Sequence, residues 1–208
     1  MGFALCNPHR MDYPPGEMMD VLSEAIQRRT SVRVKSGPQT KHASVAAVLR
    51  PGGDMLLIRR SLKEGDPWSG HMAFPGGRAE PADADLQATA MRECSEEVGL
   101  DLDSARLLGR LDDNISPSRQ SLPPRLIISA FVFAIGDPAP ALTLNHEVAS
   151  AHWISLERFV AQEGRGKMPF TWRGHEVMLP EVRIDGTHIW GLTLRIIDDL
   201  CARIRASR

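Results

Sequence analysis

Apolar residues recur at helical spacing in three stretches of the chain. In residues 16–29, the positions that fall on one side of a helix are Met18, Leu22, Ala25 and Ile26. Residues 85–100 include Gly99 at a place where a helix commonly ends in the left-handed backbone region. In residues 192–206, one apolar stripe contains Leu192, Ile196, Leu200 and Ile204. We therefore predict a helix in each stretch.

Short apolar runs between turn-forming residues predict strands. Residues 45–49 and 55–58 flank the turn sequence Pro-Gly-Gly-Asp, which is typical of a hairpin. We predict further strands over 106–111 and 124–136, a strand leading into a short helix over 147–164, and a hairpin over 175–190. Residues 112–124 read as a polar loop, which is placed to meet a ligand. Strands flanked by helices predict an α/β fold with one mixed β-sheet sandwiched between α-helices.

Composition narrows the class of protein. The chain has 208 residues, of which 42% are hydrophobic and 25% charged, and its formal net charge is -1. We predict an N-terminal extension with a helix over residues 1–40 and one main domain over 41–208. Balanced charge favours neither nucleic acid nor a membrane surface as partner, and no apolar run approaches the length of about 18 residues that spans a bilayer. The cysteines Cys6, Cys94 and Cys201 form no CxxC pair, which favours a reduced, cytoplasmic location.

Three glutamates in the second predicted helix indicate a metal site. Residues three and four apart share a helix face, so Glu93, Glu96 and Glu97 are expected to project towards one point. Their mutual repulsion favours a bound hard cation, Mg²⁺ or Mn²⁺, which takes carboxylate, water and phosphate oxygens as ligands. The alternative is a solvated acidic helix end in which Arg92 pairs with a neighbour. Gly76 and Gly77, which precede the helix in the string Phe-Pro-Gly-Gly, favour the metal site because glycine lets a backbone approach a ligand closely.

The combined string resembles the signature of the Nudix hydrolase family. The second half of that signature reads Arg-Glu, an apolar residue, any residue, Glu-Glu, any residue, Gly and an apolar residue, and it is matched by Arg92, Glu93, Cys94, Glu96, Glu97, Gly99 and Leu100. The first half is displaced, because Arg78 and Ala84 stand where the family has Gly and Glu, so the loop carries one extra residue. Glu80 or Asp83 is then the loop acid that braces the arginine. The resemblance covers residues 43–205 and implies a Nudix fold.

Within this family the chain looks most like the coenzyme A diphosphatase branch. The stretches that agree are "FPGG" with its longer loop, "LLIRRS", "LNHEVASAHWISLERF" and "IWGLTLRII". Residues 62–73 depart from the branch, with Gly65 in place of an arginine and His71 in place of a glutamine. The resemblance implies metal-dependent hydrolysis of a diphosphate linkage in a small nucleoside diphosphate derivative, with coenzyme A or its acyl derivatives giving 3′,5′-ADP and (acyl-)phosphopantetheine. The alternatives are hydrolysis of ADP-ribose, dinucleoside polyphosphates or a related compound, or a non-catalytic binding protein of the same fold.

Roles for the site residues follow from the signature. Glu93 and Glu97 are the main predicted metal ligands, Glu96 joins them directly or through water, and Arg92 orients a carboxylate. The water proton goes either to Glu97 or to Glu147, which the branch resemblance places near the site. Gly76 and Gly77 are predicted to contact substrate or metal through the backbone. Oligomeric state is not encoded in any motif, and a homodimer is the commonest assembly.

Substrate contacts are expected from the loops around the helix. Arg60, at the end of a predicted strand that leads into the site, is the preferred phosphate ligand, and His71 is a further candidate. Other arginines that are able to bind phosphate are Arg59, Arg119 and Arg125. Trp68 either stacks on a base or packs against the sheet. We predict that Trp153 and Trp190 are core residues because they stand in apolar runs.

Overall fold

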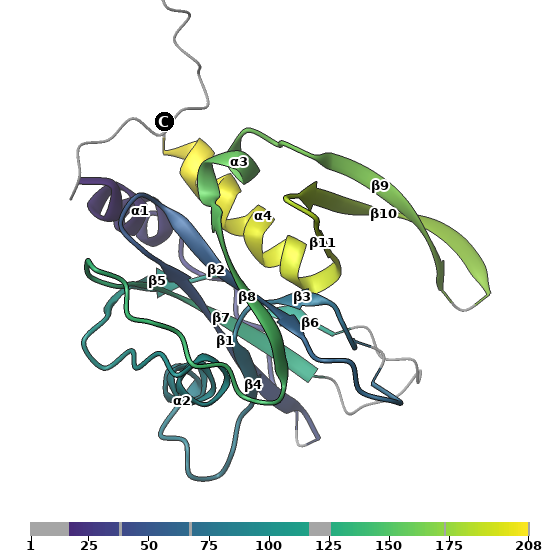
Figure 1. Cartoon of the computed structure of the whole chain (residues 1–208), viewed down its shortest axis with the longest axis horizontal. Helices are drawn as coiled ribbons and strands as arrows, with labels where there is room; N and C mark the ends of the chain where they lie inside the picture. The colour runs from purple at the N-terminus through teal and green to yellow at the C-terminus, as the bar shows by residue number, and fades with distance from the viewer. Residues whose placement is uncertain (1–16, 38, 67, 117–125, 173, 208) are drawn as a thin grey trace, which may run out of the picture.

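The computed structural model describes residues 17–37, 39–66, 68–116, 126–172 and 174–207. Figure 1 shows the chain, whose main sheet has strands β1 (Lys41–Leu49), β2 (Asp54–Arg60), β3 (Met72–Ala73), β4 (Gly76–Arg78), β5 (Arg106–Arg110), β6 (Asn114–Ile115), β7 (Leu126–Ala134) and β8 (Val148–Ser155). A smaller sheet has strands β9 (Arg165–Trp172), β10 (His175–Ile184) and β11 (Thr187–Trp190). The helices are α1 (Glu17–Gln27), α2 (Leu86–Val98), α3 (Leu156–Val160) and α4 (Gly191–Ala206).

The main sheet is mixed, as the sequence predicts. Its central path runs β3-β2-β1-β7-β5, with β8 on β2, β4 on β1 and β6 on β7. Strands β1 and β7 are parallel, whereas β1 pairs antiparallel with β2 and β4. Residues 46–49 of β1 are all fully buried, which is typical of a strand covered on both faces.

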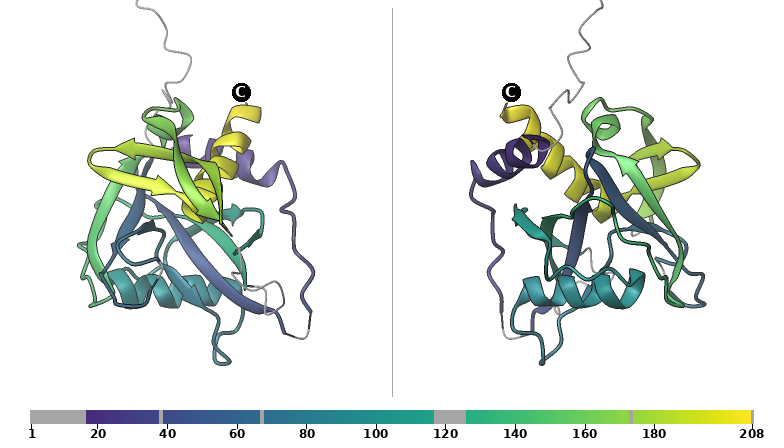
Figure 2. Two further views of the ribbon diagram at one scale, coloured as in Figure 1. Left: turned by 90° about the vertical axis from the view of Figure 1, so that its right-hand side faces the viewer. Right: turned by 60° about the vertical axis from the view of Figure 1, so that its left-hand side comes forward.

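Helices cover both faces of the sheet. On one face Ala46 and Val48 pack with Cys94 and Val98 of α2. On the other face the neighbouring residues Ala47 and Leu49 belong to a core that includes side chains of α1, α3 and α4. Because successive strand residues point to opposite faces, β1 contributes to both cores. Figure 2 shows α2 on one side of the sheet and α4 on the other, and the predicted α/β sandwich is confirmed.

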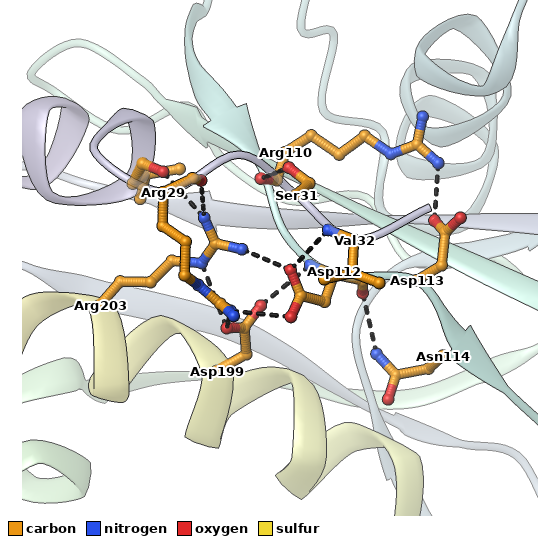
Figure 3. A network of polar contacts seen from close by, with 10 residues as sticks. Arg29, Ser31, Val32, Arg110, Asp112, Asp113, Asn114, Asp199 and Arg203 are labelled. Atoms are coloured by element: carbon orange, nitrogen blue, oxygen red, sulfur yellow. Dashed lines mark hydrogen bonds and ion pairs between the residues drawn. The ribbon is translucent and has the colours of Figure 1, made fainter. Parts of the chain in front are cut away.

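The N-terminal helix α1 is held to the main body by a polar network around Arg203 (Figure 3). Arg203 lies on α4 with a side chain only 1% exposed. Its guanidinium donates to the carbonyls of Ile26 and Arg29 at 2.9 and 2.7 Å, and to Asp112 at 2.7 Å. Arg29 in turn contacts Asp112 at 2.7 Å. Although the sequence predicts residues 1–40 as an extension, α1 shares the main core through Leu22 and Ile26.

Several short or exposed strands were not predicted. Strand β4 has only three residues, two of them glycine, and β6 falls within the predicted polar loop 112–124, of which residues 117–125 lie outside the described part of the chain. Strand β9 also went unpredicted, and it forms with β10 a two-stranded ribbon that extends from the body in Figure 1. None of the helices in the described residues is long and apolar enough to cross a membrane.

Candidate active site

Strand β4 brings a glycine pair against helix α2. Gly76 pairs with Val45 of β1, and a Cβ atom on Gly76 would stand 2.4 Å from the carbonyl oxygen of Ser44. Only glycine fits so close to the neighbouring strand. The backbone N–H of Gly76 is thereby aimed at helix α2, where it donates a 2.8 Å hydrogen bond to the Glu97 carboxylate.

Glu97 is a buried acid. The residue is only 2% exposed, and burial raises the pKa of its carboxyl from 4.5 to about 7. The hydrogen bond from Gly76 opposes this increase, while the nearby charges of Glu93 and Glu147 add to it. At neutral pH the carboxyl is therefore close to its titration midpoint, and a cation beside it would favour the ionised form.

Glu93 lies one turn earlier on the same helix and faces Gly77. A Cβ atom on Gly77 would stand 2.4 Å from Oε1 of Glu93, so the second glycine makes room for this carboxylate. The Glu93 side chain is 17% exposed, and burial raises its pKa, with the neighbouring Arg92 opposing the increase. The two glycines therefore have different roles. Gly76 lets β4 fit against β1, and Gly77 leaves room for the Glu93 carboxylate.

Arg92 is bound by carboxylates on both of its sides. Its Nε and one terminal nitrogen donate to Asp83 at 2.9 and 3.1 Å. The other terminal nitrogen donates to Glu93 and Glu96, each at 3.1 Å. This forked geometry is characteristic of strong arginine–carboxylate pairs. Arg92 therefore contacts the Glu93 carboxylate beside Gly77.

The loop acid that braces Arg92 is Asp83. Its side chain is 6% exposed, and it accepts further hydrogen bonds from the Thr89 hydroxyl at 2.8 Å and the Glu80 N–H at 2.9 Å. The Arg92 guanidinium holds the pKa of Asp83 well below its usual range. Glu80, the other acid that the sequence left open, has an exposed side chain and contributes its backbone N–H.

Glu93 and Glu97 together suit a hard divalent cation. Glu97 is buried and Glu93 partly buried, and both carboxyls have raised pKa values; Mg²⁺ is commonly held by one or two such groups plus water and substrate phosphate. Glu96 instead turns to Arg92 and is 56% exposed. The described residues contain no group of three or more His, Cys, Asp or Glu side chains ready to hold a metal. The expected meeting of three carboxylates is therefore not found, because Arg92 draws Glu96 to the helix surface.

The predicted alternative base, Glu147, is also close to the helix. The loop that carries it is fastened to α2, since Asn145 donates its N–H to the Glu97 carbonyl at 3.0 Å. The Glu147 carboxylate is 48% exposed, and its charge raises the pKa of both Glu93 and Glu97. The loop that contains Asn145 therefore holds the partly exposed Glu147 near Glu93 and Glu97.

Arg60 and His71 are joined by a backbone hydrogen bond. The Arg60 side chain is 29% exposed and contacts Asp66 at 3.1 Å, and its positive charge lowers the pKa of Glu97. Its Nε is buried and has no hydrogen-bond partner among the described residues. The His71 carbonyl accepts the Arg60 N–H at 3.0 Å, and burial lowers the pKa of its imidazole.

The remaining candidates from the sequence are three arginines and three tryptophans. Arg59 contacts the Gly186 carbonyl at 3.4 Å, and Trp68 is 51% exposed. Arg119 and Arg125 lie outside the described residues. Trp153 is half-buried and packs against the core on the α2 side of the sheet. Trp190 is half-buried and outside both cores, so the prediction is wrong for Trp190. Trp190 packs edge-on against His71 with ring centroids 4.9 Å apart; it stands next to the site, and its apolar sequence neighbours concealed this.

Comparison with known proteins agrees with this geometry. A model of the NUDIX domain matches residues 40–171, a range that contains α2, the glycine pair, Arg60 and Glu147. The chain belongs to the Nudix family. Nudix hydrolases use divalent metals such as Mg²⁺ or Mn²⁺, in keeping with the paired carboxylates. This Nudix chain is accordingly a hydrolase of phosphorus-containing anhydrides that acts on nucleoside diphosphate derivatives.

Relatives extend the similarity beyond the domain. Over 183 residues the Nudix chain is 29% identical to the mitochondrial coenzyme A diphosphatase NUDT8 of Mus musculus, with 86% of this chain and 83% of the mouse protein covered. It is 30% identical over 164 residues to the uncharacterized Nudix hydrolase NudL of Yersinia pestis, with 77% of each covered. An uncharacterized protein of Schizosaccharomyces pombe is 42% identical over 112 residues. That match covers 52% of this chain and only 34% of the yeast protein.

Proposed function

We propose that this Nudix hydrolase cleaves the diphosphate bridge of coenzyme A or its acyl derivatives. Water attacks one phosphorus, the bridging P–O bond breaks, and the products are 3′,5′-ADP and (acyl-)phosphopantetheine, each ending in a phosphate. The observation that carries the proposal is the similarity to a coenzyme A diphosphatase over most of both chains. The buried Glu97, set against the Gly76 N–H, supports diphosphate chemistry but does not select the substrate.

In this proposal Glu93 and Glu97 hold Mg²⁺ or Mn²⁺, while Glu96 stays paired with Arg92 at the helix surface. When bound, the cation neutralises charge on phosphate oxygens and lowers the pKa of a coordinated water. Arg92 keeps the Glu93 carboxylate in place through the 3.1 Å contact. Gly76 lets β4 lie close against β1, and Gly77 leaves room for the Glu93 carboxylate, so the glycine pair keeps both acids in place.

The proton of the attacking water goes to Glu147. This acid is half-exposed and close enough to Glu93 and Glu97 to raise the pKa of each, so it is able to accept a proton and release it to solvent. Arg60 binds a phosphate oxygen, because its buried Nε has no partner among the described residues and the group carries a fixed positive charge. His71, which is joined to Arg60 by a backbone hydrogen bond, is a further substrate contact in this proposal.

Product analysis by mass spectrometry tests the proposal. The purified protein is incubated with about 5 mM Mg²⁺ or Mn²⁺, a concentration suited to weakly held ions, and with coenzyme A, ADP-ribose, NADH or diadenosine polyphosphates. The matched control is Glu97→Gln. Formation of 3′,5′-ADP and phosphopantetheine by the unmodified protein and not by the variant supports the proposal. Cleavage of another diphosphate, with coenzyme A left intact, would refute it.

A further inference from the structure

The β9–β10 ribbon and β11 present one continuous face. Val177 pairs with Phe170 and Leu179 pairs with Met168, so these four side chains lie on the same side of the ribbon. Glu181 pairs with Gly166 on β9 and with Trp190 on β11, which places Trp190 at the inner end of the same face. We call Met168, Phe170, Val177, Leu179 and Trp190 the arm face.

The arm face is apolar and, within the part of the chain that the structure describes, only partly buried. Val177 is 37% exposed, and the other four side chains are half-buried. The opposite face of β9 carries the exposed residues Arg165, Lys167, Pro169 and Thr171. Figure 1 shows the ribbon extending away from the helices and the main sheet. A two-stranded ribbon with one apolar face gains stability when something packs on that face.

Its inner end is joined to the active site. Trp190 contacts Phe170 with ring centroids 5.3 Å apart and His71 at 4.9 Å. The backbone carbonyl of His71 in turn accepts the backbone N–H of Arg60, and the charge of the Arg60 side chain lowers the pKa of Glu97. Glu181 follows Val177 and Leu179 on the same side of β10. Its charge is neutralised by an ion pair with Arg183 at 2.9 Å. A ligand that leaves the diphosphate site on this side therefore meets an apolar surface.

We propose that the arm face binds the acyl chain of an acylated substrate whose diphosphate lies at Glu93 and Glu97. This rests on the proposed function and narrows it to acyl thioesters of coenzyme A. A long row of Met, Val, Leu and Phe side chains suits an aliphatic chain, because each methylene that packs on it is removed from water. Pairing with a second copy along the free edge of β9 is disfavoured by Lys167 and by Pro169, which has no N–H to donate.

Acetyl- and octanoyl-coenzyme A provide the test, because both yield 3′,5′-ADP, which is measured by chromatography. A fully buried methylene contributes about fourfold to affinity. On an open face we expect octanoyl-coenzyme A to exceed acetyl-coenzyme A in kcat/KM by at least about tenfold. Val177→Asp places a charge on the arm face, and we expect it to lower this ratio by about tenfold. Met178→Asp is the control, since Met178 is 55% exposed on the opposite face, and the ratio stays unchanged.

The other outcomes overturn the inference in distinguishable ways. An octanoyl to acetyl ratio that is the same in the unmodified protein and in Val177→Asp refutes the arm face and leaves the coenzyme A assignment standing. If neither thioester is cleaved while another diphosphate is, both proposals fail. Sedimentation velocity covers the remaining case: a dimer that becomes a monomer in Val177→Asp shows that a second copy occupies this face instead.

Discussion

The backbone N–H of Gly76 donates a 2.8 Å hydrogen bond to the carboxylate of Glu97, 21 residues later in the chain. This bond joins the short strand β4 to the last turn of helix α2. It forms because Gly76 fits against Ser44 of β1 without a side chain. The position of the buried acid therefore depends on the absence of a methyl group in the neighbouring strand.

We expect alanine at Gly76 to lower mainly stability and alanine at Gly77 to lower mainly activity. In Gly76→Ala the new Cβ meets the Ser44 carbonyl at 2.4 Å, and φ is +156°, so we expect a loss of about 3 kcal/mol in the free energy of unfolding. In Gly77→Ala the three atoms nearest to the new Cβ all belong to the Glu93 carboxylate, the first at 2.4 Å. We expect a stability change below about 1 kcal/mol and at least a hundredfold drop in kcat, because the acid is displaced.

Urea unfolding followed by circular dichroism, together with hydrolysis rates, measures both effects. Gly136→Ala is the matched control, since nothing lies within 4 Å of a Cβ at that position, and it should change stability by less than about 0.5 kcal/mol. Equal destabilisation by the substitutions at Gly76 and Gly77 would contradict the separate roles assigned to them.

Glu97 should make stability depend on pH in the metal-free protein. Its folded pKa of about 7 lies above its ordinary value of 4.5, so the unfolded chain loses the proton first. Stability is therefore unaffected below pH 4.5, falls as pH rises from 4.5 to 7, and stays reduced above 7, by on the order of 3 kcal/mol. Glu97→Gln removes this decrease. Unfolding in EDTA at pH 5 and pH 8 measures it for both proteins.

Adding a divalent metal tests the role of Glu97 in this pH dependence. A cation bound beside Glu97 favours the ionised carboxylate, so adding Mn²⁺ should restore stability at pH 8 more than at pH 5 in the unmodified protein. The Glu97→Gln variant should respond less. Identical pH profiles for the two proteins in EDTA would show that Glu97 is not the titrating group.

Helix α2 could be predicted from the sequence better than the segments around it. Helix α2 begins after Asp85, whose side chain accepts the Ala88 N–H at 2.8 Å, and ends at Gly99 with φ of 68°. These are local signals, readable from residue types at fixed spacing. Strand β9 escaped prediction because its Pro169 and charged residues serve an exposed ribbon and do not resemble a core strand.

The site could be predicted only as far as spacing determines it. The loop has one residue more than the family signature, so the sequence does not show whether Glu80 or Asp83 braces Arg92. Only the fold shows that Asp83 accepts a hydrogen bond from Arg92 at 2.9 Å. Helical spacing likewise grouped Glu96 with the other acids, although an arginine four residues earlier binds it at the surface. Which partner an ionised side chain chooses depends on burial, and burial is a property of the folded chain.

Asp83 and Glu80 now give a matched pair of tests. Asp83→Asn removes the charge that holds Arg92, so we expect a loss of about 2 kcal/mol in stability. A drop of at least about tenfold in kcat should accompany it because Glu93 loses its orientation. Glu80→Gln should leave kcat within about twofold, since its exposed carboxylate does not contact Arg92. Steady-state kinetics and thermal unfolding compare the variants, and an effect of Glu80→Gln equal to that of Asp83→Asn would show that the brace is misassigned.

Arg203 should stabilise the attachment of α1. Its buried guanidinium binds the Ile26 and Arg29 carbonyls at the end of α1 and the Asp112 carboxylate, so Arg203→Met leaves these acceptors without their donor. We expect a loss of about 3 kcal/mol in the free energy of unfolding, and faster amide exchange in α1 than in α2. Arg28→Met is the control, because Arg28 is 60% exposed and contacts Glu24 at 3.7 Å, and it should cost less than about 0.5 kcal/mol. Uniform exchange across both helices in Arg203→Met would instead show that α1 and the sheet unfold as one unit.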